Sequence, residues 1–322
     1  MKEIVEKINK LGKEKTPFLF IIDFDMEKPI ALQLKEIDSN TILFSLNGNT
    51  NSICNPHYYS RSTKFVSNPV SKSRYEKAFS YVQKHIKHGN SFLVNLTMPS
   101  PIETNLELEE IFHRSNAKYK LWLKDQFVVF SPETFIKTTG TKISSFPMKG
   151  TMDASLPNAK QQLLESKKEL AEHYTIVDLI RNDLSMVAKN VKVKKFRLID
   201  KIETNSGGLF QMSSEIVGDL PVNYLDNLGD MLIKMLPAGS ISGAPKKKTL
   251  EIINEAEQYK RGYYTGIFGV FDGKNIDSGV MIRYIEQTHG GLVYKSGGGI
   301  TVQSNVDEEY KELIDKIYLP LI

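Results

Sequence analysis

Apolar residues recur along this chain at two different spacings, and each spacing predicts a different kind of element. Residues 168–184 carry Leu170, Tyr174, Val177 and Ile180 at three- and four-residue steps, which is typical of one apolar stripe on a helix. Shorter apolar runs bounded by turn residues, such as FLFIIDFD at 18–25, indicate buried strands. The pattern therefore predicts a mixture of helices and strands.

The predicted strands follow one another in hairpin-like pairs, with helices between the clusters. Helices are expected near 1–15, 72–88, 107–115, from about 157, near 224–235 and 246–258, and at the end of the chain. Strands are expected at 18–25, 41–46, 91–99, 119–123, 126–130, 134–138, 141–148, 191–203, 214–220, 264–271, 278–286 and 292–296. This order favours an α+β fold with antiparallel sheets over a doubly wound parallel sheet. No repeat or linker is evident, so we expect one compact unit.

Composition narrows the class of protein. The chain has 322 residues, of which 40% are hydrophobic and 25% charged, as in soluble globular proteins. A net charge of +4 is too small to indicate nucleic acid and is compatible with a small anionic substrate. The single cysteine, Cys54, excludes an internal disulfide and fits a reducing compartment. The charged start and the lack of a long apolar run predict a cytoplasmic protein without a membrane partner.

Two pairs of glutamates have the spacing that places both carboxylates on one face of a helix. Glu169 and Glu172 lie three residues apart in the helix of residues 168–184, and Glu309 and Glu312 repeat this spacing in the last helix. Such oxygen-rich pairs suit Mg²⁺, which binds few carboxylates directly and keeps several waters. The alternative is a pair of ordinary solvated helix faces.

A lysine and a glutamate beside predicted strands are candidates for proton transfer or nucleophilic attack. Lys149 follows a strand in FPMKGT, and a lysine in a partly desolvated pocket can act as a nucleophile or a base. Glu133 opens a strand, where burial would let it act as a general acid. A solvated lysine and a capping or surface glutamate are the alternatives.

Two further features of the last third of the chain could bind an anion. The glycines of SGGGIT at 296–301 would let backbone N–H groups approach an anion, although a bulge or turn fits them equally well. Arg283 lies within the apolar strand predicted at 278–286, where it could bind a carboxylate or form an internal ion pair. Tyr264 could point inward near a strand start, although such an aromatic residue is more often part of the core.

Eight stretches, in order, resemble the chorismate-utilising enzymes, which include anthranilate synthase component I, aminodeoxychorismate synthase component I and the isochorismate and salicylate synthases. The stretches are GNSFLVNLT (89–97), SPETF (131–135), PMKGT (147–151), ELAEHYTIVDLIRNDL (169–184), PAGSISGAPK (237–246), RGYYTG (261–266), MIR (281–283) and SGGGIT with DEEYKELIDK (296–316). The resemblance covers residues 75–322, and the first 70 residues match weakly and look shortened.

The resemblance implies a fold and a set of site residues. The fold would be a single catalytic domain over residues 1–322, with largely antiparallel sheets packed in layers and helices outside. Glu172 and Glu312 match direct Mg²⁺ ligands, Glu169 and Glu309 match carboxylates that act through water, and Glu133 matches the general acid. The residues that match groups binding the substrate are Tyr264, Arg283, Lys316, Gly297, Gly298, Gly299, Ser240, Gly150 and Thr151.

Lys149 narrows the reaction that the resemblance implies. Anthranilate and salicylate synthases typically carry Ala at this position, whereas aminodeoxychorismate synthases use the lysine to attack C2 of chorismate before ammonia adds at C4. The leading hypothesis is therefore aminodeoxychorismate synthase component I, a step toward 4-aminobenzoate and folate. Anthranilate synthase component I, an isochorismate or salicylate synthase, and a catalytically silent subunit are the alternatives.

The chain differs from the family at one site position and in its amino-terminal part, and a domain that would supply ammonia is not recognisable. Gln211 stands where relatives often carry a histidine, so any proton transfer by that histidine is absent. The shortened amino-terminal part leaves open a regulatory amino-acid pocket. No glutamine-amidotransferase domain is recognisable, so we expect ammonia from a separate glutamine amidotransferase subunit, or free ammonia.

Overall fold

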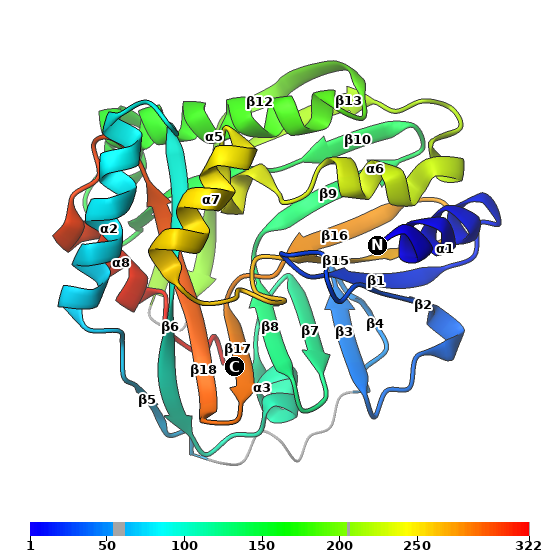
Figure 1. Cartoon of the computed structure of the whole chain (residues 1–322), viewed down its shortest axis with the longest axis horizontal. Helices are drawn as coiled ribbons and strands as arrows, with labels where there is room; N and C mark the ends of the chain where they lie inside the picture. Colours follow the sequence, from blue (N-terminus) through cyan, green and yellow to red (C-terminus); the bar gives the residue numbers. More distant parts are fainter. Residues whose placement is uncertain (54–61, 205–206, 322) are drawn as a thin grey trace. The chain divides into compact units, whose positions relative to one another are not determined.

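The computed structural model describes residues 1–53, 62–204 and 207–321, so Cys54 lies outside the described residues. The chain divides into two compact units (Figure 1), each assembled from three separate segments. The first unit comprises Met1–Leu34, Glu133–Ser240 and Ile267–Gly279, and the second comprises Lys35–Pro132, Ile241–Gly266 and Val280–Ile322. The prediction of a single catalytic domain stays a prediction.

The first unit is built on a nine-stranded sheet whose strands run antiparallel to their neighbours. Its order is β11-β13-β10-β9-β16-β15-β1-β2, with β12 paired to β13. The strands are β1 (Phe18–Ile22), β2 (Ile30–Gln33), β9 (Thr134–Thr139), β10 (Lys142–Ser145), β11 (Met148–Asp153), β12 (Lys189–Thr204), β13 (Gly207–Asp219), β15 (Ile267–Phe271) and β16 (Ile276–Val280). Its helices are α1 (Lys2–Lys13), α4 (Ala159–Glu165), α5 (Lys167–Ser185) and α6 (Leu228–Lys234).

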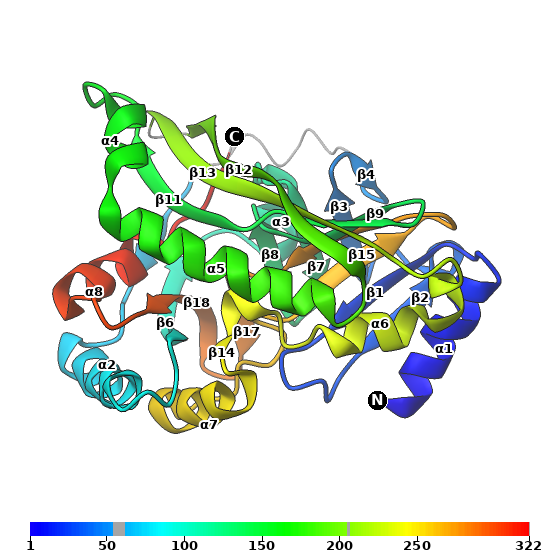
Figure 2. The same ribbon diagram turned by 90° about the horizontal axis from the view of Figure 1, so that it is seen from above.

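Burial explains why these segments form the first unit. All five residues of β1 are buried, because the strand lies between β2 and β15 and its apolar side chains are covered on both faces. Helix α5 packs along β11, β12 and β13 (Figure 2), with Ile176, Val177, Ile180 and Leu184 buried. The spacing of apolar residues predicted that Tyr174 belongs to this buried stripe. The prediction was wrong for this residue, because 56% of its surface is exposed.

The second unit is built on another nine-stranded antiparallel sheet. Its order is β14-β6-β18-β17-β8-β7-β3-β4, with β5 paired to β6. The strands are β3 (Ile42–Leu46), β4 (Asn49–Thr50), β5 (Phe65–Ser67), β6 (Leu93–Thr104), β7 (Tyr119–Leu123), β8 (Phe127–Ser131), β14 (Gly243–Ala244), β17 (Tyr284–Thr288) and β18 (Gly291–Ile300). Its helices are α2 (Lys72–Lys87), α3 (Leu108–Arg114), α7 (Lys246–Glu257) and α8 (Val306–Asp315).

Two apolar clusters hold the second unit together. One joins α2, α7 and α8 to β6 and includes Tyr75, Val82, Leu96, Ile253 and Leu313. The other joins α3 to β7, β8, β17 and β18. Each of these helices has one apolar and one polar face, and the apolar face covers the sheet, as expected for an α+β fold. Among the described residues, no helix is long and apolar enough to cross a membrane.

Three predictions of where strands begin and end were wrong, two in the last third of the chain and one near Lys149. The strand predicted at 278–286 is two strands, β16 and β17, which belong to different sheets, and Arg283 lies between them rather than inside a strand. The glycines 297–299 are not a turn but part of β18, paired with β6. Lys149 lies within β11 rather than after a strand.

Candidate functional site

In the first unit, the predicted nucleophile faces one of the predicted metal ligands. The Nζ atom of Lys149 on β11 lies 3.4 Å from Oε2 of Glu172 on α5. The two side chains are 22% and 13% exposed, so neither is freely solvated. The packing of α5 against β11 brings these two residues together although they are 23 positions apart. The interpretation of Lys149 as a solvated lysine at a strand end is therefore wrong.

Gly150 lies beside Glu169, the other predicted metal-binding glutamate of α5. A Cβ atom at position 150 would lie 2.9 Å from Oε2 of Glu169, and the backbone φ of +85° is in the region that favours glycine. Ser166 caps the helix that carries both glutamates, because its side chain accepts a hydrogen bond from the N–H of Glu169 at 3.3 Å. Thr151 continues β11, and its side chain lies outside the described part of the structure.

Glu133 and Ser240 line one pocket of the first unit, together with Ser145, Asp183 and apolar side chains. Asp183 was missed by sequence reasoning. Its Oδ2 atom accepts a hydrogen bond from the N–H of Gly239 at 2.8 Å, so the end of α5 fixes the backbone directly before Ser240. Asp183 stands between the buried residues Ile180 and Leu184 in LIRNDL, and the sequence there gave no signal of this contact.

His173 follows Glu172 in sequence and is fully buried. Its Nε2 atom lies 2.6 Å from Oγ of Ser214, which also accepts a hydrogen bond from the N–H of Arg197. Burial, and to a smaller extent the charge of Arg197, lowers the pKa of His173 to about 4. The imidazole is therefore neutral near pH 7, and its contact with Ser214 joins α5 to β13.

In the second unit, the glycines of β18 lie against the glutamates of α8. A Cβ atom at position 298 would lie 3.1 Å from Oε1 of Glu312 and 3.4 Å from Oε2 of Glu309. Lys316 Nζ donates to the carbonyl oxygen of Gly297 at 2.7 Å and to Oε1 of Glu312 at 2.5 Å. Glu309 is only 4% exposed, so it is not an ordinary solvated glutamate, whereas the side chain of Glu312 is 45% exposed.

A buried tyrosine adds to this group. Burial raises the pKa of Tyr75 on α2, and the charges of Glu309 and Glu312 raise it further. Its hydroxyl is buried and has no hydrogen-bond partner among the described residues.

Tyr264 and Arg283 also belong to the second unit. Tyr264 is 3% exposed, and its ring centroid lies 5.7 Å from that of Tyr284. Arg283 has a φ of 54°, and its guanidinium carbon lies 5.2 Å from the centroid of the Tyr318 ring. Its Nε atom lies 3.4 Å from the Tyr318 hydroxyl, and no carboxylate partner is found for it in the described part of the chain. The internal ion pair considered for Arg283 is therefore absent there.

The glutamates and glycines fit the chemistry of a magnesium site. Carboxylate oxygens are the ligands that Mg²⁺ prefers, and each pair of glutamates faces a glycine whose missing side chain leaves room beside it. Within either unit of the described residues, no group of three or more His, Cys, Asp or Glu side chains could hold a metal ion. Each unit supplies two of the four predicted carboxylates, and the ligand set stays a prediction.

Comparison with known proteins identifies the class to which this fold and these residues belong. Residues 13–321 match the model of the chorismate binding enzymes, so the chain belongs to this family. Two solved structures of the same class share the fold: anthranilate synthase component I from Streptococcus pneumoniae and MenF, the menaquinone-specific isochorismate synthase from Escherichia coli. The first has a TM-score of 0.68 with 20% identity, covering 93% of this chain and 79% of that one. The second has a TM-score of 0.70 with 14% identity, covering 98% and 80%.

Relatives in sequence include proteins of more than one activity within this family. An uncharacterized PabA-like protein of Haemophilus influenzae is 51% identical over 321 residues, which are 100% of this chain and 97% of that protein. Aminodeoxychorismate synthase component 1 of Salmonella typhimurium is 32% identical in an alignment that covers 80% of this chain and 59% of that protein. Anthranilate synthase component 1 of Haloarcula marismortui is 32% identical in an alignment that covers 73% of this chain and 50% of that protein. The predicted family and the predicted α+β fold are confirmed.

Proposed function

We propose that this chain aminates chorismate at C4 to give 4-amino-4-deoxychorismate, a step toward 4-aminobenzoate and folate. The observation that carries the proposal is the contact of Lys149 with Glu172 at 3.4 Å. It places an amine with little solvent exposure at the carboxylate that is predicted to bind the metal. A lysine used only for solubility has no reason to occupy this position, whereas a nucleophile must be held close to its substrate.

The reaction proceeds by two substitutions, each of which moves the ring double bonds. The lone pair of neutral Lys149 forms a bond to C2, the two ring double bonds shift, and the bond between C4 and its oxygen breaks. Glu133 gives its proton to the departing hydroxyl, which leaves as water, and the proton then lost by the lysine nitrogen restores the acid form of Glu133. Ammonia then bonds to C4, the double bonds shift back, and the bond between C2 and the lysine nitrogen breaks. The nitrogen of the product gives up a proton, and Lys149 regains one.

Glu172 and Glu312 would hold Mg²⁺ directly, with Glu169 and Glu309 acting through water. When bound, Mg²⁺ supplies a positive charge that binds a carboxylate of chorismate and offsets the charge of Glu172, which otherwise favours the ammonium form of Lys149. Arg283 and Lys316 add positive charge for the substrate carboxylates, and Tyr264 contributes a hydroxyl group.

Ammonia is expected from a separate glutamine amidotransferase subunit. Relatives such as those of Salmonella typhimurium and Escherichia coli are named component 1 of aminodeoxychorismate synthase, which supports a partner of this kind. Free ammonium would replace the partner in a purified system, so the amination itself can be tested with this chain alone.

The product decides between the proposed reaction and its alternatives. The purified chain is incubated with chorismate, Mg²⁺ and ammonium, and the products are separated by chromatography. We expect 4-amino-4-deoxychorismate, and none when Mg²⁺ is removed with a chelator. Formation of ortho-aminobenzoate would show an anthranilate synthase, and isochorismate or salicylate would show the other branch of the family. Any of these in place of the 4-amino product contradicts the proposal.

A further inference from the structure

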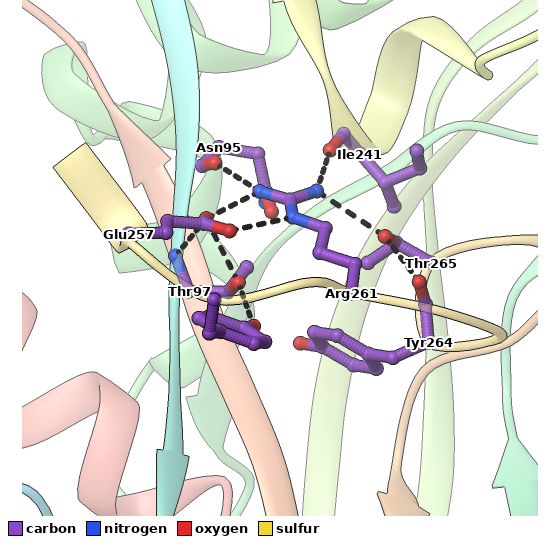
Figure 3. A network of polar contacts seen from close by, with 8 residues as sticks. Asn95, Thr97, Ile241, Glu257, Arg261, Tyr264 and Thr265 are labelled. Carbon is purple, nitrogen blue, oxygen red and sulfur yellow. Dashed lines mark hydrogen bonds and ion pairs between the residues drawn. The ribbon is translucent and has the colours of Figure 1, made fainter. Parts of the chain in front are cut away.

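The second unit contains a fully buried ion pair that no step of the proposed reaction uses. Arg261 and Glu257 have side chains that are each 1% exposed, and NH2 of Arg261 lies 2.6 Å from Oε1 of Glu257. Figure 3 shows the guanidinium of Arg261 surrounded by Glu257, Asn95, Ile241 and Thr265. A charged pair so deep in a fold is costly unless all its polar groups are bonded, so each of its partners matters.

The guanidinium of Arg261 uses all of its hydrogen-bond donors. Nε donates to Oε2 of Glu257 at 2.9 Å, and NH2 donates to Oε1 of Glu257 and to the carbonyl oxygen of Asn95 at 2.7 Å. NH1 donates to the carbonyl oxygen of Ile241 at 2.9 Å and to Oγ1 of Thr265 at 3.2 Å. An arginine has five N–H donors in a fixed planar fork, and no other side chain can match these acceptors.

Glu257 fixes the other side of the pair. Its Oε1 atom accepts hydrogen bonds from both the N–H and the hydroxyl of Thr97 on β6, each at 2.8 Å. The carbonyl oxygen of Asn95, two residues earlier on β6, is bonded to Arg261, and Asn95 is the register partner of Gly299. The pair therefore holds the stretch of β6 that lies directly beside the glycines predicted to bind the substrate.

Arg261 also determines the path of the loop that carries Tyr264. Thr265 has a φ of 62°, which is unfavourable for a β-branched residue and needs support from its surroundings. Its hydroxyl accepts a hydrogen bond from Arg261 and donates one to the carbonyl oxygen of Tyr264 at 2.6 Å. The chain of contacts therefore runs from Glu257 through Arg261 and Thr265 to the backbone of Tyr264.

The same loop is joined to the segment of Arg283. The N–H of Thr265 donates to the carbonyl oxygen of Met281, and the N–H of Met281 donates to that of Gly266, both at 2.8 Å. Met281 precedes Arg283 by two residues in the turn between β16 and β17. A buried lysine supports the loop from its start, because Lys295 Nζ donates to the carbonyl oxygen of Arg261 at 2.9 Å.

We infer that Glu257 and Arg261 are positioning residues for substrate binding, which fix the backbone that presents Tyr264, Arg283 and the glycines of β18. The role rests on the proposed function, since these groups bind substrate only if the chain acts on chorismate. The pair touches none of the reacting atoms, so its loss weakens binding of chorismate and leaves the chemical step largely intact.

A second buried pair in the same unit provides a matched control. Glu110 and Arg114 on α3 are also spaced by four residues, are 6% and 8% exposed, and lie 3.2 Å apart. Arg114 donates to Oγ1 of Thr63 rather than to a segment that carries a predicted substrate residue. Changes to this pair report the general effect of disturbing a buried ion pair.

The test compares Arg261→Lys and Glu257→Gln with Arg114→Lys and Glu110→Gln in the full chain. Chorismate binding is measured by titration calorimetry with Mg²⁺ and without ammonia, KM and kcat by product formation, and stability by thermal unfolding. For Arg261→Lys and Glu257→Gln we expect Kd and KM to rise about tenfold, the equivalent of one lost hydrogen bond, with kcat within about threefold. For the control pair we expect a lower Tm and a Kd within about twofold of the original.

A milder variant covers the case in which the ion-pair variants do not fold. Thr265→Ala removes the methyl group and the hydroxyl between Arg261 and the carbonyl of Tyr264, whereas Thr265→Ser removes the methyl group alone and keeps the hydroxyl. We expect weaker chorismate binding for the alanine variant and recovery for the serine variant. Equal affinity in both, or an equal loss of affinity in the control pair, would overturn the positioning role alone. An original chain that binds no chorismate would overturn the proposed function and this role with it.

Discussion

At the residue scale, the proposed chemistry depends most on Lys149, because an amine is nucleophilic only without its proton. The neighbouring carboxylate of Glu172 at 3.4 Å favours the charged form. If Mg²⁺ and substrate bind at Glu172 as proposed, their binding would offset this charge and favour the neutral amine. The nucleophile would then form only in an occupied site.

Replacement of Lys149 tests the covalent step directly. With chorismate and Mg²⁺ but no ammonia, mass spectrometry of the original chain should detect an adduct on Lys149, because no amine is present to release it. Lys149→Ala should lose the adduct and the formation of 4-amino-4-deoxychorismate, while thermal unfolding shows that it still folds. Full turnover by Lys149→Ala, with no adduct ever trapped on the original chain, would exclude the covalent route.

The general acid can be tested in the pocket where Glu133 lies. Glu133→Gln keeps the shape of the side chain but cannot give a proton to the departing hydroxyl, so kcat should fall by about 10²–10⁴-fold. Ser145→Ala, in the same pocket, removes only a hydroxyl that donates to the carbonyl oxygen of Phe135. This control should lose some stability and keep most of its kcat. Comparable kcat values for the two variants would argue against Glu133 as the acid.

Neighbouring glycines of β18 should respond differently to the same substitution. A Cβ atom at Gly297 would lie 2.3 Å from the carbonyl oxygen of Leu96, so Gly297→Ala should cost about 1–3 kcal/mol of unfolding free energy. A Cβ atom at Gly298 would instead meet Glu312 at 3.1 Å. Gly298→Ala should therefore need several-fold more Mg²⁺ for half-maximal activity, with a smaller loss of stability. Urea unfolding and Mg²⁺ titrations separate the effects, and the reverse ranking would contradict this assignment.

At the scale of elements, the spacing of apolar residues predicted most helices and strands, because amphipathic packing on a sheet leaves a local trace. Strand pairings and side-chain contacts between residues far apart in the sequence could not be predicted from this spacing. The segment 278–286 reads as one apolar strand, yet β16 and β17 join different sheets. The glycine run reads as a turn, but pairing with β6 keeps it extended. Asp183 and the Glu257–Arg261 pair act on partners far along the chain, so only the fold reveals them.

The cap of α5 is a local feature whose effect on the site can be measured. Ser166→Ala removes the acceptor for the N–H of Glu169 and should cost about 1 kcal/mol. Because the first turn of α5 carries Glu169, the apparent affinity for Mg²⁺ should fall as well. Ser71 caps α2 with the same geometry, accepting from the N–H of Arg74 at 3.3 Å. Ser71→Ala should lose as much stability with unchanged Mg²⁺ dependence, and equal Mg²⁺ effects in both variants would contradict the prediction.

At the scale of the whole molecule, each unit draws on segments that are far apart in the sequence. The first unit takes its strands from three regions between Met1 and Gly279, so no window of the sequence corresponds to it. Nothing in composition or linker content marks the boundaries of either unit along the chain. The paired glutamates were still found, since helical spacing is local, and the resemblance to the family gave them a role before the fold was known.

The four predicted metal ligands are divided equally, with Glu169 and Glu172 in the first unit and Glu309 and Glu312 in the second. If Glu172 and Glu312 bind one ion, then loss of either should remove most of the Mg²⁺-dependent activity, and loss of both should cost little more. Glu172→Gln, Glu312→Gln and the double variant are compared through kcat/KM at saturating Mg²⁺. Glu165→Gln, on the exposed end of α4, serves as the control and should match the original chain. Losses that simply multiply in the double variant would mean that the two carboxylates act independently, and the single-ion prediction would then be wrong.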